Sequence, residues 1–161
     1  MTRLWGIALG LAIVSFIYYE LTTLIDLYPF NNVRGSTPSE RSTEAVINGI
    51  PLLVAAILIA LSAFASVKWL AFVAAAVVGI LAIMGLLLWW LPYAADVTVP
   101  WATVPGTTWA ELHARTYAET IIVVPPIGNR PRPNLEHMIL HALFLGTAGV
   151  ALASALERVK A

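Results

Sequence analysis

Long apolar stretches alternate with polar ones along this chain, and four of them are long enough to cross a lipid bilayer. A helix needs about 20 mainly apolar residues to cross roughly 30 Å of hydrocarbon. Four segments meet this length, at residues 4–25, 45–66, 69–92 and 138–156. The sequence therefore predicts an all-α fold, a four-helix transmembrane bundle that forms one integral membrane domain over residues 1–161.

The connections between these segments are unequal. Only Val67 and Lys68 join the second and third segments, whereas residues 26–44 and 93–137 form two longer loops. With four crossings, both loops must lie on the same side of the membrane, where we expect them to form a cap of loops and short helix. No small-x-small cleavage site follows the first segment, so we expect it to remain as an anchor and not to be removed as a signal peptide.

Basic residues indicate which side is cytoplasmic. The face with the short connection and the termini has few residues and holds Arg3, Lys68, Arg158 and Lys160, while five arginines are spread over the two longer loops. Cytoplasmic segments are enriched in lysine and arginine. The sequence therefore predicts a multi-pass protein of the cell membrane with both termini cytoplasmic and the large loops extracytoplasmic.

Several helix ends can be located from local signals. Capping boxes predict helices that begin at Pro38 and at Trp109. The first would extend the second spanning helix by about two turns beyond the membrane, and the second would start a short amphipathic helix that runs to about Ile122. Pro51 predicts a kink inside the second segment, and Asn134 is the expected N-cap of the fourth.

Small residues recur at helical spacing in the first and fourth segments. In lipid, such stripes let two helix backbones approach closely. We expect internal packing of these stripes in preference to self-association. The residues are Gly6, Gly10, Ala142, Gly146, Gly149 and Ala153.

Composition excludes several functional classes. The chain is 60% hydrophobic and 11% charged, its 9 basic and 9 acidic residues cancel, and it has no cysteine. A net charge of zero gives no basic field to attract nucleic acid, and the absence of cysteine excludes disulfides and thiolate metal sites. No nucleophile elbow, P-loop or dinucleotide fingerprint is present, so acyl and phosphoryl transfer have no support.

Ionisable and amide side chains inside the predicted spans are the main candidates for function. Glu20, Asn48 and His141 fall at similar depths in the first, second and fourth segments, towards the outer leaflet. Because polar groups are costly in hydrocarbon, they usually face the interior of a bundle and often mark functional sites. We predict that these three residues meet inside the bundle.

Two histidines raise the hypothesis of a metal site. His137 and His141 are four residues apart on one helical face, and Glu44, Glu20 or His113 could complete a nitrogen and oxygen shell for a divalent metal ion. The helix lacks the glutamate of an HExxH motif, and a bis-histidine haem has weaker support, since no second spanning helix offers a histidine. The alternative is a structural network in which Glu20 pairs with His141.

The loops carry a third set of candidates. Arg130 and Arg132, fixed by neighbouring prolines, and Trp109 are predicted to contact an anion or a partner. Salt bridges from these arginines to Glu40 and Glu44, or simple solvation, are the alternative.

Two classes of function remain. The first is a non-catalytic accessory subunit or scaffold of a larger membrane assembly, with the lipid bilayer around it and with other membrane proteins or a second copy as partners. The alternative is a metal-dependent membrane enzyme, or a small-molecule or lipid-binding protein, with a Glu/His site in the outer leaflet.

Overall fold

The computed structural model of this chain describes residues 3–101, 103, 106–117 and 119–160. The side chains of residues 158–160, among them Arg158 and Lys160 of the charge argument, lie outside the described part. Within these ranges the ordered elements are all helices and no strand is present, as the sequence predicts.

Four helical stretches are long and apolar enough to cross a membrane. The first is α1 (Arg3–Leu24), and the fourth is α7 (Leu135–Lys160). The second stretch joins α2 (Pro38–Glu44), η2 (Ala45–Gly49) and α3 (Ile50–Ala65). The third joins α4 (Trp69–Gly85), η3 (Leu86–Trp90) and α5 (Leu91–Ala95). Two short helices, η1 (Val33–Gly35) and α6 (Trp109–Thr116), lie in the longer connections.

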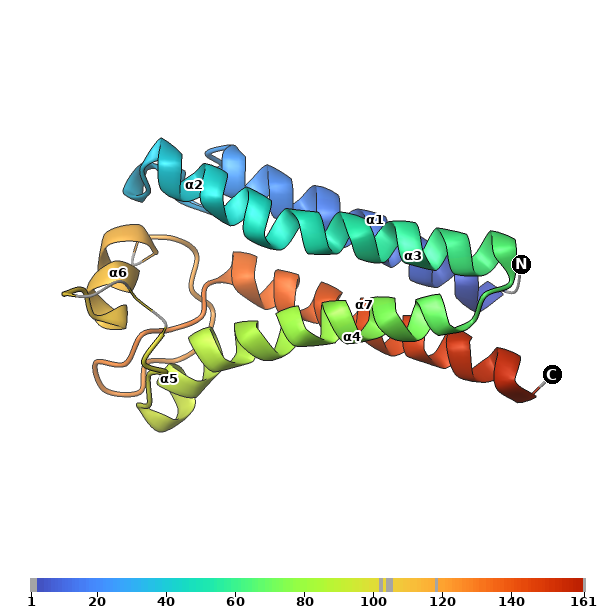
Figure 1. Cartoon of the computed structure of the whole chain (residues 1–161). Coiled ribbons are helices and arrows are strands. Elements are labelled where there is room, and N and C mark those ends of the chain that lie inside the picture. The colour runs from blue at the N-terminus through green and yellow to red at the C-terminus, as the bar shows by residue number, and fades with distance from the viewer. Residues whose placement is uncertain (1–2, 102, 104–105, 118, 161) are drawn as a thin grey trace.

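The four long stretches pack as a ring in which α1 and α4 each contact both α3 and α7. Both termini and the tight α3–α4 turn lie at one end of the bundle (Figure 1). Residues 25–37 and the described residues of 96–134 lie at the opposite end, which we call the loop end. Towards the loop end the α1–α3 pair and the α4–α7 pair diverge, and α6 lies between them (Figure 1).

The predicted helix starts are confirmed. The Thr37 hydroxyl accepts from the Glu40 amide, and the Glu40 carboxylate accepts from the Thr37 amide, so α2 begins with a capping box. Thr108 and Glu111 form the same arrangement before α6. The Asn134 side chain accepts from the backbone amide of His137 and so caps α7.

The predicted end of the short loop helix is wrong. Instead of continuing to Ile122, α6 ends at Thr116, and Tyr117 has left the helical region with φ −122° and ψ −11°. The Ile121 amide bonds the carbonyl of Pro29 at 2.9 Å, which ties the chain to the other loop. A tertiary hydrogen bond has therefore replaced the last helical turns that the local pattern favours.

The prolines inside the spanning helices do not end them. Pro51 and Pro92 each follow a π-helical turn, η2 and η3 respectively, and the helix continues beyond both. Proline lacks the amide that an α-helix requires, and wider turns are a common way to accommodate the change in hydrogen bonding.

The helix contacts are made by small residues, but of the predicted stripes only the half-buried Gly146 takes part, with Leu11 of α1 beside it. Gly6, Gly10, Ala142, Gly149 and Ala153 are exposed. The buried faces instead carry Ala8, Ala12 and Ser15 on α1, and Thr147, Ala151, Ser154 and Ala155 on α7.

Polar residues explain which face is buried. The Ser15 and Thr147 hydroxyl oxygens are 3.0 Å apart, and both side chains are fully buried. The Ser15 hydroxyl also donates to the Leu11 carbonyl of its own helix at 2.8 Å. Its contact with Thr147 adds a partner in another helix, which favours the rotation of α1 and α7 that leaves Gly6, Gly10 and Gly149 exposed.

Candidate functional site

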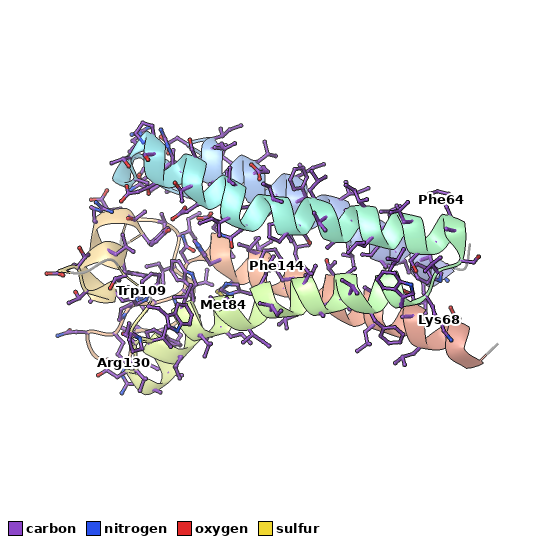
Figure 2. All side chains as sticks on the ribbon, in the orientation of Figure 1. Phe64, Lys68, Met84, Trp109, Arg130 and Phe144 are labelled. Atoms are coloured by element: carbon purple, nitrogen blue, oxygen red, sulfur yellow. The ribbon has the colours of Figure 1, made fainter. Side chains whose placement is uncertain are left out.

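A cavity of about 250 Å³ opens at the loop end of the bundle. It is lined by residues of the four long helical stretches, of η1 and of α6. Its lining is apolar where it extends into the bundle, through Leu81, Met84, Leu140 and Phe144; Met84 and Phe144 are labelled in Figure 2. Towards the loops the lining is polar and aromatic.

Trp89 is the centre of the aromatic wall of this cavity. Its ring stacks on His137 with centroids 3.7 Å apart. Its centroid also lies 4.7 Å from that of Tyr117, 5.4 Å from Trp109 and 5.5 Å from His113. These rings come from η3, from α6 and its end, and from α7. Their contacts hold the long loop against the bundle.

The protonation of His137 follows from its fixed partner. His137 Nδ1 lies 2.7 Å from Asn134 Oδ1, and the Asn134 amide nitrogen donates to the Glu136 carboxylate at 3.4 Å. This second bond sets the orientation of the amide, and an amide oxygen only accepts. In the neutral ring the proton therefore sits on Nδ1, and Nε2 keeps its lone pair.

His141 is held in the opposite tautomer. The Trp90 indole Nε1 donates to His141 Nδ1 at 3.0 Å. An indole nitrogen can only donate, so the neutral ring carries its proton on Nε2. A methyl group on Gly85 would lie 2.4 Å from His141 Nε2, so the imidazole packs directly against this glycine.

His113 lies at the outer edge of the aromatic wall, outside the spanning segments. Its Nε2 lies 2.7 Å from the Arg132 carbonyl, to which it must donate. Burial lowers the pKa of His113 below its ordinary value. The neutral form is thus the one that this position favours.

The structure does not support the predicted metal centre. Among the described residues, no three histidine, aspartate or glutamate side chains lie close enough to hold a metal ion. The Trp90 hydrogen bond occupies the one lone pair of neutral His141, and metal ligation needs a free lone pair. The five predicted ligands Glu20, Glu44, His113, His137 and His141 are therefore not assembled around one point.

The residues of the predicted intramembrane cluster, Glu20, Asn48 and His141, do not all lie at the same site. Asn48 and His141 both line the cavity. Asn48 donates to the Tyr19 hydroxyl at 2.8 Å, and this hydroxyl donates to the Glu44 carbonyl at 3.0 Å. The Glu20 carboxylate instead lies beside Gly49, where a methyl group would collide with it, and Glu20 is not among the described lining residues.

The loop arginines bind backbone carbonyls. Arg130 Nη1 donates to the Ala94 carbonyl at 2.7 Å, at the end of α5, and Arg132 Nη1 donates to the Val124 carbonyl at 3.4 Å. The predicted alternative of salt bridges to Glu40 and Glu44 does not occur among the described contacts: Glu40 pairs with Arg115 at 3.2 Å. Both arginines and His113 line a second hollow of about 270 Å³, separate from the cavity described above.

Two polar atoms of α6 were not anticipated from the sequence. Trp109 Nε1 and Thr116 Oγ1 are buried and have no hydrogen-bond partner in the part of the chain that the structure describes. Their residues are 6% and 3% exposed, and both line the cavity with Leu112. Spacings of three and seven residues place all three on one face of a helix. The sequence could have indicated this shared face through the spacing of the three residues.

Two opposite charges of α2 also line the cavity. Arg41 and Glu44 are three residues apart, and Arg41 Nη1 makes a long hydrogen bond of 3.4 Å to the Val33 carbonyl. Within the described ranges neither side chain has an oppositely charged partner within ion-pair distance. Glu44 lines the cavity and is also exposed, so it stands at the opening.

No family model, curated protein or solved structure matches this chain. The functional argument therefore rests on the chemistry of the cavity.

Proposed function

We propose that this protein binds a small amphipathic molecule or lipid in the cavity at the loop end. The observation that carries the proposal is that Trp109 and Thr116 both line the cavity, while the buried Nε1 and Oγ1 atoms of these residues have no hydrogen-bond partner among the described residues. An unsatisfied buried polar group costs about 1–3 kcal/mol. A ligand that supplies hydrogen-bond acceptors at this wall would remove that penalty.

The arrangement of the lining also favours an amphipathic ligand. Apolar side chains of α4 and α7 line the part that extends into the bundle, and polar side chains line the part nearest the loops. Ligand sites commonly combine mostly apolar walls with a few convergent polar groups. Four helices apolar enough to span a membrane indicate a lipid environment, so an amphiphile could enter from the bilayer.

The placement in the membrane is part of this proposal. We infer that the termini lie in the cytoplasm and that the loop end lies outside, because the basic residues of the chain are densest near the termini and the α3–α4 turn. The cavity would then open at the outer surface of the membrane.

Filling the cavity tests the proposal. Met84 lines the cavity, whereas its neighbour Ile83 is 57% exposed on the outside of α4. Met84→Trp should reduce the amount of co-purified lipid or small molecule that native mass spectrometry detects after purification in mild detergent, and Ile83→Trp should not. Equal adducts on wild type and both variants would contradict the proposal.

The outward glycines support a second candidate, the accessory subunit or scaffold. Gly6 and Gly10 are exposed, and a methyl group built on Gly10 meets no atom within 4 Å. A lipid-facing GxxxG pair is a common helix dimerisation surface. Chemical crosslinking in membranes tests it: Gly10→Ile should abolish a crosslinked homodimer or heteromer that the control Ala76→Ile, at an exposed small residue of α4, retains. Identical crosslinking patterns in both variants would exclude this face.

A further inference from the structure

We infer that the ligand of the cavity is a zwitterionic phospholipid, whose head group joins an ammonium to a phosphate as in phosphoethanolamine or phosphocholine lipids. This inference rests on the proposed function and specifies its ligand. Three features of the cavity carry it: a separated pair of opposite charges, the partnerless donors of α6, and the apolar walls.

The charges match a head group that carries both signs. The Arg41 guanidinium and the Glu44 carboxylate both line the cavity, and they do not pair with each other or with another charge among the described residues. Adjacent opposite charges on one helix gain little from each other when water screens them. A bound ammonium beside Glu44 and a phosphate beside Arg41 would satisfy both groups.

A ligand of one sign fits less well. An anionic lipid would place its charge near Arg41 but would also bring it close to Glu44, which stands at the opening of the cavity. A cationic amphiphile would meet the reverse conflict with Arg41, and Glu136, the other carboxylate of the lining, already accepts a hydrogen bond from the Asn134 amide. Because like charges repel at a binding site, a ligand of either single sign is disfavoured.

The donors on α6 suit the oxygens of the same head group. Trp109 Nε1 can only donate, and the Thr116 hydroxyl can donate as well. Their residues line the cavity at the two ends of α6, and a helix rises by about 10 Å over this stretch at 1.5 Å per residue. Phosphate and ester oxygens along one phospholipid are acceptors spread over a comparable length.

The apolar walls favour a lipid over a free head group. Leu81, Met84, Leu140 and Phe144 line the part of the cavity that extends into the bundle, and these side chains offer no hydrogen bond. Acyl chains would bury this surface, whereas soluble phosphocholine would leave it in contact with water.

Lipid binding by delipidated full-length protein in mild detergent, measured by native mass spectrometry, tests the inference. The probes are dihexanoyl phosphatidylcholine, the corresponding phosphatidylglycerol, dihexanoylglycerol and soluble phosphocholine. Wild type should bind phosphatidylcholine about tenfold more tightly than phosphatidylglycerol or dihexanoylglycerol, which is the scale of one hydrogen bond to a charged group. Phosphocholine alone should bind more weakly still.

Charge variants identify the groups responsible. Glu44→Gln should remove the preference for phosphatidylcholine over phosphatidylglycerol, and Arg41→Gln should weaken both phospholipids about tenfold but leave dihexanoylglycerol unchanged. Matched controls are Glu119→Gln and Arg34→Gln, which change exposed residues that do not line the cavity. Both controls should bind as wild type does, and circular dichroism establishes that every variant is folded.

The outcomes separate the inference from the proposed function. If all four probes bind with equal affinity and Met84→Trp abolishes that binding, the cavity binds ligands. The inference that the ligand is zwitterionic is then overturned. Phosphocholine that binds as tightly as the lipid would overturn the choice of a lipid. Binding that is absent, or that Met84→Trp leaves unchanged, would overturn the inference and the proposed function together.

Discussion

The contact between Gly85 and His141 gives a quantitative test of how α4 and α7 pack. A methyl group added at Gly85 would lie 2.4 Å from His141 Nε2 and 2.5 Å from Cδ2. Ordinary contacts between such atoms begin near 3.5 Å, so the imidazole must move by about 1 Å. Because the Trp90 indole holds the other side of the ring at 3.0 Å, this movement also strains or breaks that hydrogen bond.

The expected cost follows from these two effects. Overpacking costs about 1–3 kcal/mol, and the loss of a hydrogen bond costs about 1 kcal/mol more. Alanine regains about 1 kcal/mol of helix propensity over glycine. Gly85→Ala should therefore destabilise the protein by about 1–3 kcal/mol.

Gly79→Ala on the same helix is the matched control. A methyl group at Gly79 meets no atom within 4 Å, so this variant should gain about 1 kcal/mol. Thermal unfolding in detergent should separate the two variants by on the order of 10 °C. Adding His141→Ala to Gly85→Ala should remove most of the penalty from the clash, since the two changes share one contact. Equal midpoints for Gly79→Ala and Gly85→Ala would refute the packing described here.

Three further predictions concern topology, pH and the α6 donors. The chain has no cysteine, so single cysteines can report its orientation. A cysteine at position 42 should react with a membrane-impermeant maleimide on intact cells, whereas a cysteine at position 67 should react only after lysis. The opposite pattern would invert the proposed orientation. Burial lowers the pKa of His113 in the folded protein. As the pH falls below about 6.5, the histidine therefore binds a proton more readily in the unfolded chain, and the stability of the folded protein should decrease. His113→Gln should flatten part of this decrease in pH-dependent unfolding, and an unchanged profile would contradict it. Thr116→Val keeps the shape of the side chain and removes a buried hydroxyl that has no partner among the described residues, so it should change the stability of the ligand-free protein by less than about 1 kcal/mol while weakening ligand binding; a large loss of stability would show that the hydroxyl has a partner.

The sequence was sufficient for the helices and their order because their signals are local. Apolar length locates the spanning segments, and the capping boxes at Thr37 and Thr108 locate two helix starts, since each depends on residues only three positions apart. The end of α6 could not be predicted in this way. It depends on the hydrogen bond from Ile121 to Pro29, which joins two loops that are distant in sequence.

Helix rotation limited the prediction of the candidate site. Depth along each helix follows from counting residues, which is a local property of the sequence. Rotation about the helix axis depends on partners in other helices, such as Ser15 with Thr147 and Trp90 with His141. These contacts orient the residues of the predicted cluster differently, so Asn48 and His141 line the cavity while Glu20 lies beside Gly49.

A gradient of side-chain volume along the bundle accounts for the cavity at the loop end. Near the termini and the α3–α4 turn, the buried faces are largely alanine and serine apart from Trp5, as at Ala8, Ala71 and Ala155. Small residues let helix backbones approach closely. Nearer the loop end, bulky residues such as Trp89 and Phe144 replace them. The helix pairs diverge over this stretch (Figure 1), and α6 supplies the wall that the helices no longer provide. The tightly packed end can thus hold the bundle together while the other end remains open to a ligand, so large residues introduced among the alanines should impair folding before they alter binding.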